Sequence, residues 1–145
     1  MTKKIIATGV LAVGMMMAAS PVAVKAAVVC FNLARANATV GSSDNRTVQY
    51  TVNPGGDAAE IETEFNDAAR VYQDLAGKVV VSMNSGEFRT YSATFYQLVD
   101  GKKKLVAGNF KVVGATRVAF NVGKYDKSLP LQIDAQISGS RNTRG

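Results

Sequence analysis

Alternation of apolar and polar residues is the feature that most restricts the fold of this chain. Residues 131–137 alternate without a break, with Leu, Ile, Ala and Ile separated by Gln, Asp and Gln. Residues 47–52 and 116–122 repeat the same period of two. Successive side chains of a β-strand point to opposite faces, so this period is typical of strands that bury one face and expose the other. The chain is therefore expected to build its core from β-sheets.

Further strand patterns fill the second half of the chain. Residues 78–83 are rich in valine, residues 88–99 form a long run of Thr, Tyr and Phe, and residues 102–107 and 110–113 are shorter apolar runs. Asp100 with Gly101, and Gly108 with Asn109, are residue pairs that favour two-residue hairpin turns. Strands joined by such tight turns pair antiparallel. We expect a series of antiparallel hairpins here.

Residues 28–40 combine apolar and small side chains, which indicates an extended strand with an interruption. The cluster of Gly, Ser, Asp and Asn at residues 41–45 predicts a turn before the strand at residues 47–52.

Residues 57–76 change to a helical period. Apolar side chains from Ile61 to Ala76 recur at steps of three and four, and polar side chains take the other positions. Asp57 is placed to cap the first turn with Glu60 completing a capping box, and Gly77 is placed at the end. The pattern predicts one amphipathic helix.

The expected fold class is therefore mainly β: an antiparallel β-sandwich with one amphipathic helix, residues 57–76. The alternative is an α+β fold with an open antiparallel sheet. In both cases the helix covers a face or an end of the sheets.

The N-terminus has the order of a secretory signal peptide. Lys3 and Lys4 precede an apolar run that is shorter than a membrane-spanning helix, and Pro21 and a segment of small residues follow. Cleavage after Ala26 would leave one β-rich domain, residues 27–138, and a flexible basic tail, residues 139–145. The mature protein is expected to be secreted, periplasmic or on the cell surface of a bacterium, with no membrane span.

The amino-acid composition limits the kinds of functional site that the chain can form. The chain has no histidine and one cysteine, so histidine-dependent catalysis and an internal disulfide are excluded. Of the 17 Lys and Arg, three belong to residues 1–26, which leaves 14 basic against 11 acidic residues, a balance of +3. This modest charge favours no nucleic-acid partner. Cys30 is expected to be a small buried side chain, with pairing to another chain as the alternative.

No catalytic, cofactor or metal site is predicted, and we expect no enzyme and no cofactor. Glu60 and Glu64 would lie one helical turn apart and could face a cation, but a solvated acidic face is the favoured interpretation. A basic set could contact an anionic surface polymer or lipid headgroups, although lysines on a strand more often protect a sheet edge. These residues are Lys102, Lys103, Lys104, Arg141 and Arg144.

The leading functional hypothesis is an exported structural protein, a fimbrial or biofilm-matrix type subunit for cell adhesion that associates through its sheet edges. Its partner would be another copy or another exported protein. The candidate assembly strand, in which small side chains could fill a partner's groove, comprises Val28, Val29, Phe31, Leu33, Ala36, Ala38 and Val40.

The alternative is a monomeric periplasmic binding or inhibitor module that holds a peptide, lipid or enzyme on loops and a concave sheet face. Aromatic residues of the long strand could line that face: Phe88, Tyr91, Phe95 and Tyr96. The N-terminal segment separates the two hypotheses. If residues 28–40 pack within their own domain, self-assembly by strand donation loses its main support.

Overall fold

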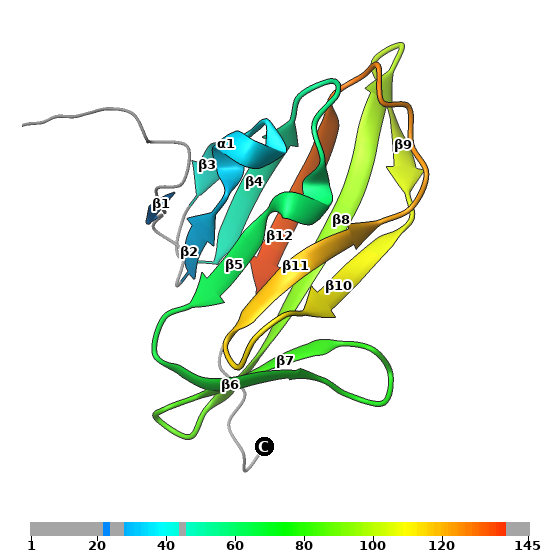
Figure 1. The fold of residues 1–145 in the computed structure, drawn as a ribbon. Coiled ribbons are helices and arrows are strands. Elements are labelled where there is room, and N and C mark those ends of the chain that lie inside the picture. The colour runs from blue at the N-terminus through cyan, green and yellow to red at the C-terminus, as the bar shows by residue number, and fades with distance from the viewer. Residues whose placement is uncertain (1–21, 24–27, 44–45, 139–145) are drawn as a thin grey trace, which may run out of the picture.

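The structure is a computed structural model that describes residues 22–23, 28–43 and 46–138 (Figure 1). The predicted leader lies outside the described residues except for Val22 and Ala23, and the predicted tail, residues 139–145, lies wholly outside them. Two antiparallel sheets face each other. The mainly β sandwich expected from the sequence is confirmed, in preference to the open sheet.

Sheet I has five strands, which come from three separate parts of the chain. Its order across the sheet is β1 (Val22–Ala23), β2 (Val28–Phe31), β5 (Glu62–Phe65), β11 (Arg117–Val122) and β10 (Gly108–Val112).

Sheet II has seven strands. Its main order is β3 (Ala38–Ser43), β4 (Thr47–Val52), β12 (Leu131–Ile137), β8 (Phe88–Val99), β7 (Val79–Met83) and β6 (Ala68–Gln73), and β9 (Lys102–Val106) also pairs with β8. The predicted strands at residues 47–52, 88–99 and 131–137 have the bounds of β4, β8 and β12.

The long strand β8 takes two successive partners on one side. Its first part, residues 88–91, pairs with β7, and its last part, residues 95–99, pairs with β9. The β8–β9 hairpin turns at Asp100 and Gly101, whose φ angles of 54° and 77° are those of the predicted two-residue turn. This hairpin carries the last part of β8 away from β7 and β6 (Figure 1).

The second predicted hairpin, at Gly108 and Asn109, is wrong. Strand β9 belongs to sheet II and β10 to sheet I, so the chain crosses between the sheets at Ala107. Glycine is required at position 108 because the backbone there passes close to the Phe95 ring. A Cβ on Gly108 would lie 2.6 Å from Cδ1 of Phe95. A glycine that signals a turn can equally signal a close approach of the backbone to a ring.

The predicted helix over residues 57–76 is also wrong. A single 3-10 turn, η3 (Ala58–Glu60), is followed by β5 in one sheet and β6 in the other. The predicted N-cap at Asp57 is confirmed, although it caps η3. The Asp57 side chain accepts a hydrogen bond from the Ala59 N–H at 3.0 Å. Gly77 adopts a φ of 86°, but in the turn that follows β6.

Residues 60–65 explain the error. They read Glu-Ile-Glu-Thr-Glu-Phe, an alternation in which Ile61, Thr63 and Phe65 are buried. Because Thr63 is polar, the spacing of Ile61, Phe65 and the alanines that follow imitated a helical stripe. The alternation typical of a strand was present, but one residue of the buried face, Thr63, carries a hydroxyl group instead of an apolar side chain.

Residues 28–40 are three elements rather than one strand. Strand β2 is followed by one helical turn, α1 (Leu33–Ala36), and then by β3. Asn32 and Asn37 bound that turn in the left-handed region, with φ of 63° and 59°. Asparagine tolerates this conformation better than most residues, so the two asparagines place the reversal that joins the sheets.

We expect Gly108→Ala to lower the free energy of unfolding by about 1–3 kcal/mol, because the added methyl group has to displace the Phe95 ring in a packed core. Urea denaturation followed by circular dichroism measures it. Gly41→Ala is the matched control, since its Cβ would meet only Gln49 O at 3.9 Å. Equal effects of the two substitutions would contradict the close-approach explanation.

Candidate functional site

The outer face of sheet II carries a regular array of polar side chains. The three central strands β4, β12 and β8 align in register, so every second residue of each strand faces outward beside its neighbours. We call this array the polar grid; its rows are Ser92–Gln136–Thr47, Thr94–Asp134–Gln49 and Tyr96–Gln132–Thr51.

The grid is hollowed at its centre. A hollow of about 390 Å³ is lined by residues of all three strands, with the side chains of Ser92, Thr94 and Gln136 exposed. The hydroxyl side chains are short, and the longer Gln49 and Gln136 lie in the same rows. The hollow therefore presents hydroxyl, amide and carboxylate groups to whatever enters it.

Asp134 is the acidic member of the grid. Its Oδ1 accepts a hydrogen bond from Gln49 Nε2 at 3.2 Å, and Thr51 Oγ1 donates to Gln132 Oε1 at 3.0 Å in the next row. The pKa of Tyr96 is raised by partial burial and by the negative charge of Asp134. These contacts fix the orientation of the side chains before any ligand arrives.

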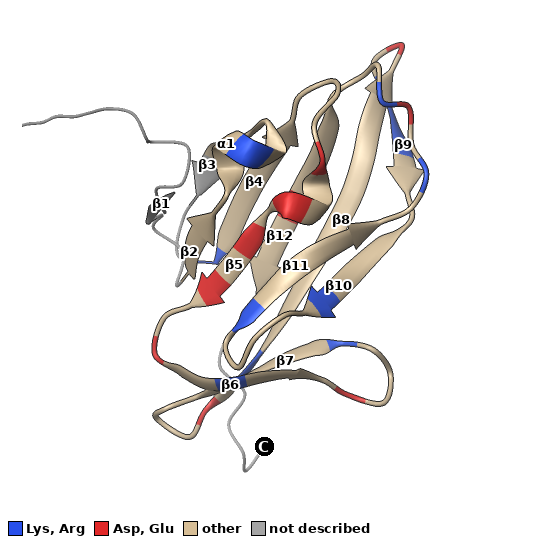
Figure 2. Cartoon of the chain, in the orientation of Figure 1, with Lys and Arg blue, Asp and Glu red and all other residues tan. Residues whose placement is uncertain are grey.

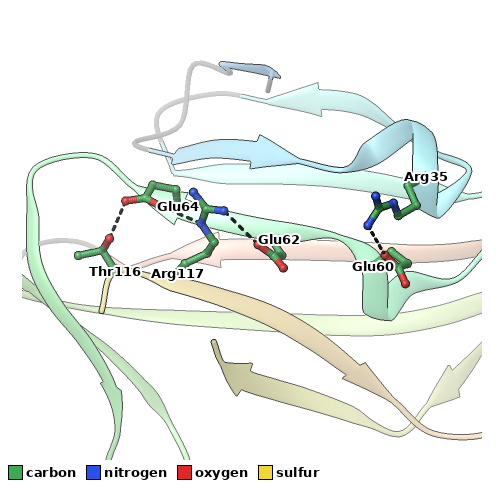
Figure 3. Close-up of polar contacts among 6 residues, drawn as sticks. All are labelled: Arg35, Glu60, Glu62, Glu64, Thr116 and Arg117. Atoms are coloured by element: carbon green, nitrogen blue, oxygen red, sulfur yellow. Dashed lines mark hydrogen bonds and ion pairs between the residues drawn. The ribbon is translucent and has the colours of Figure 1, made fainter. Parts of the chain in front are cut away.

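The outer face of sheet I is charged instead of neutral. Glu60, Glu62 and Glu64 lie along it, and Figure 3 shows Arg117 between the last two. Arg117 Nη1 is 3.1 Å from Glu62 Oε1, and its Nε is 3.0 Å from Glu64 Oε1. The guanidinium also lies 4.1 Å from the centre of the Phe31 ring.

This arrangement supplies no cation site. Glu60 pairs with Arg35 at 3.6 Å, and Glu62 and Glu64 share Arg117 (Figure 3), so each carboxylate already faces a cationic side chain. Within the described ranges, no group of three or more acidic, cysteine or histidine side chains gathers to hold a metal ion. Glu60 and Glu64 are not one turn apart on a helix: Glu60 ends η3 and Glu64 lies on β5.

Glu64 has a second partner. Thr116 Oγ1 donates a hydrogen bond to Glu64 Oε2 at 2.6 Å (Figure 3). This hydrogen bond, together with the Arg117 guanidinium, lowers the pKa of Glu64. The group is a structural tie between β5 and β11, because Arg117 begins β11 and Thr116 directly precedes it.

Cys30 is buried, as the sequence predicts, and it lies in a polar cluster between the two sheets. Its Sγ is 3.0 Å from Tyr50 Oη, which is 3.4 Å from Thr63 Oγ1. Burial raises the pKa of the Cys30 thiol and of the Tyr50 hydroxyl. A fully buried thiol with a raised pKa is a poor nucleophile, so this cluster is part of the core.

The residues of the candidate assembly strand lie within their own domain. Val28, Leu33, Ala36 and Ala38 are buried in the core, and Val29, Phe31 and Val40 are half-buried. Strand β2 pairs with β5, and β3 pairs with β4. Strand donation by this segment therefore loses its main support.

The aromatic residues of β8 divide between the two faces of sheet II. Tyr91 and Phe95 point into the core, where they contact other rings. Tyr96 lies on the outer face under Lys103, whose Nζ is 4.5 Å from the ring centre, and Phe88 is half-buried. A concave face lined by these aromatics does not form.

The basic residues are only partly placed. Lys102, Lys103 and Lys104 are all exposed on β9, whereas Arg141 and Arg144 lie outside the described residues. Sequence reasoning missed Lys124 and Lys127 of the loop at residues 123–130, and this loop runs beside β9 (Figure 2). The polar grid was missed as well, since its rows join residues far apart in the sequence, such as Gln49 and Asp134, which are 85 positions apart.

Comparison with known proteins gives a family. Residues 38–135 match the family described as domain of unknown function (DUF7948), and the chain belongs to it. No curated protein and no solved structure matches. In the part of the chain that the structure describes, no helix has the length and hydrophobicity needed to cross a membrane.

We expect Thr116→Val to raise the pKa of Glu64 toward its usual value, because the strongest hydrogen bond to the carboxylate is removed. An NMR titration of the glutamate side-chain carbons measures this shift. A folded-state pKa below the unfolded value means that ionised Glu64 stabilises the fold above the unfolded pKa, and that this stabilisation is lost as pH falls through the folded pKa.

Acid unfolding of Thr116→Val should accordingly depend less on the ionisation of Glu64. Thr51→Val is the control, since Thr51 bonds Gln132 on the other sheet. An unchanged Glu64 titration in Thr116→Val would show that Arg117 alone sets the pKa.

Proposed function

We propose that the protein is an exported, non-enzymatic binding domain that holds an uncharged, hydroxyl-rich ligand, such as a sugar chain, on the polar grid. The observation that carries the proposal is the hollow of about 390 Å³ across β4, β12 and β8. The short side chains of Ser92 and Thr94 line this hollow, and both are exposed.

The chemistry of the lining supports such a ligand. Gln136, Thr94 and Asp134 offer donors and acceptors at regular spacing, and sugar hydroxyls can pair with both. The hollow falls within the size range of roughly 300–1,000 Å³ that small-molecule sites occupy. Asp134 contributes one negative charge, which suits a hydroxyl donor and disfavours an anionic ligand.

Binding is favoured over hydrolysis at this surface. Glycoside hydrolysis ordinarily uses two carboxyl groups on either side of the bond, at about 5–10 Å from each other. Among the residues lining the hollow, Asp134 is the one with a carboxyl group. The grid therefore suits recognition of a ligand that stays intact.

We expect Asp134→Ala to weaken binding of a soluble neutral oligosaccharide by at least about tenfold, because a charged hydrogen-bond acceptor is lost from the grid. A glycan array selects the probe, and isothermal titration calorimetry measures the affinity. Asn121→Ala, at an exposed position of β11 in sheet I, is the matched control and should bind as the unchanged protein does.

Two results would overturn the proposal. One is that no neutral oligosaccharide binds to the unchanged protein. The other is that Asp134→Ala binds with unchanged affinity, which would place the ligand elsewhere.

A second function, the fimbrial or biofilm-matrix type subunit that associates through sheet edges, has one observation in its favour. Among the residues that the structure describes, the outer edge of β2 pairs with β1 alone, at Val22 with Cys30 and Ala23 with Val29. Val22 and Ala23 belong to the predicted leader. Cleavage after Ala26 would remove them and leave this edge open to a strand from another chain.

We expect Val29→Lys to reduce the association of the exported protein, since a lysine on an edge strand opposes pairing with another strand. Val29 is half-buried and lies opposite Glu64, so the ammonium group of a lysine there would face a carboxylate and the fold should persist. Light scattering over a range of concentrations measures the size, and Val29→Thr is the control. A monomer at all concentrations before any substitution would rule out association through this edge.

A further inference from the structure

The end of the sandwich formed by β9 and the loop at residues 123–130 is strongly basic. We call it the basic end; Figure 2 shows lysines on both segments, and these are Lys102, Lys103, Lys104, Lys124 and Lys127. Two acidic residues lie near them, Asp100 at the hairpin turn and Asp126 in the loop. The basic end thus has a net charge of 5 − 2 = +3.

A buried glutamine holds the loop beside the hairpin. Gln97 on β8 is 2% exposed, and its Nε2 donates to the Asp126 carbonyl oxygen at 2.7 Å. Its Oε1 accepts from the Asp126 N–H at 3.0 Å. After β9, the Gly123 N–H donates to the Ala107 carbonyl oxygen at 2.8 Å. The two lysine-bearing segments are therefore tied together by a fixed set of hydrogen bonds.

Large apolar side chains are exposed among these lysines. Leu98 is 52% exposed and Leu105 is 72% exposed. Leu98 pairs with Lys103 across the hairpin, and Leu105 pairs with Tyr96, so the two leucines and Lys103 share one face of it. Lys102 and Lys104 lie on the other face, so exposed lysines flank the leucines on both sides of the hairpin. Burying two leucines would be favourable, and the described chain provides no cover for them.

Protection of the edge does not account for this arrangement. Lysines on β9 suffice to prevent pairing with another strand. They do not require exposed leucines on the same hairpin, nor a glutamine that holds a second basic segment against it. Interleaved lysines and leucines are the combination that binds the interface of an anionic membrane, where the charges meet headgroups and the leucines enter the acyl boundary.

We propose that the basic end docks on an anionic lipid bilayer, with Leu98 and Leu105 inserted between the headgroups. The basic end adjoins the polar grid at Tyr96 but shares no residue with the lining of the hollow, so the inference goes beyond the proposed function and does not depend on it. The hairpin projects past the body of sheet II (Figure 1), which allows it to meet a flat surface.

The test uses the protein purified from cells that express the full chain, with its N-terminus determined by mass spectrometry. Co-sedimentation is measured with vesicles of phosphatidylcholine alone and with vesicles that also contain phosphatidylglycerol. We expect binding to the anionic vesicles only, and weaker binding as salt is raised. The double substitution Lys102→Gln with Lys104→Gln should weaken binding by about tenfold or more.

The matched control removes the same charge elsewhere. Lys78→Gln with Lys111→Gln should leave most of the binding intact, because these exposed lysines lie on other parts of the molecule. Leu98→Ser with Leu105→Ser should reduce binding most clearly at high salt, where charge attraction is screened. Asp134→Ala should bind vesicles normally, which separates this surface from the grid.

Three outcomes would overturn the proposal. The first is equal binding to neutral and anionic vesicles, and the second is equal loss in the two lysine double variants. The third is displacement from vesicles by soluble dextran sulfate together with no effect of the leucine substitutions. That result would assign the basic end to an anionic polymer instead of a bilayer.

Discussion

Contact between aromatic rings of the two facing sheets is the interaction on which the rest of this structure depends. Phe65 of sheet I meets Tyr91 of sheet II edge to face at a centroid distance of 4.9 Å, and Tyr91 then meets Phe110 of sheet I at 4.9 Å. Phe110 contacts Phe120, which meets Tyr50 of sheet II at 5.4 Å. With a single cysteine the chain has no disulfide to join its layers, so the interlocking rings fix how the sheets lie. The polar outer faces and the basic hairpin keep their places because the rings hold the inner faces together.

The sequence predicted the bounds of a strand where the alternation within that strand is regular. Residues 131–137 and 47–52 alternate strictly, and the structure gives them as strands with those bounds. The prediction failed where a decision depended on distant residues. Thr63 is buried beside Tyr50 and Cys30 in a polar cluster of the core, and these partners lie outside residues 57–76. Gly108 is close to Phe95 only because the chain crosses between sheets at that point. In both places tertiary packing overrode the local pattern.

The surfaces for which we propose functions depend on register, which is why the sequence suggested them only in part. Alternation shows which side of each strand is polar, but it does not show that β12 lies between β4 and β8. The grid exists only through that order, because it sets Asp134 beside Gln49 and Thr94. The basic end is similar: the three consecutive lysines are visible in the sequence, whereas the neighbouring loop is brought there by Gln97. Gln97 is a polar residue among aromatic and apolar neighbours in its strand. This pattern was the signal in the sequence for the hydrogen bonds that hold the loop.

The sheet edges show how pairing with other chains is controlled. Strand β9 carries three exposed lysines, β3 has a register shift between Val40 and Ser42, and β6 has one between Ala68 and Arg70. Charges and irregular register both hinder the addition of a further strand. Among the described strands, β2 differs, because its outer edge is covered by Val22 and Ala23 and by no charge or bulge of its own. A cover that belongs to the predicted leader would protect this edge during synthesis and be lost on cleavage. Association through β2 would then be confined to the exported form, while the lysines of β9 keep the opposite end free to meet a surface instead of another strand.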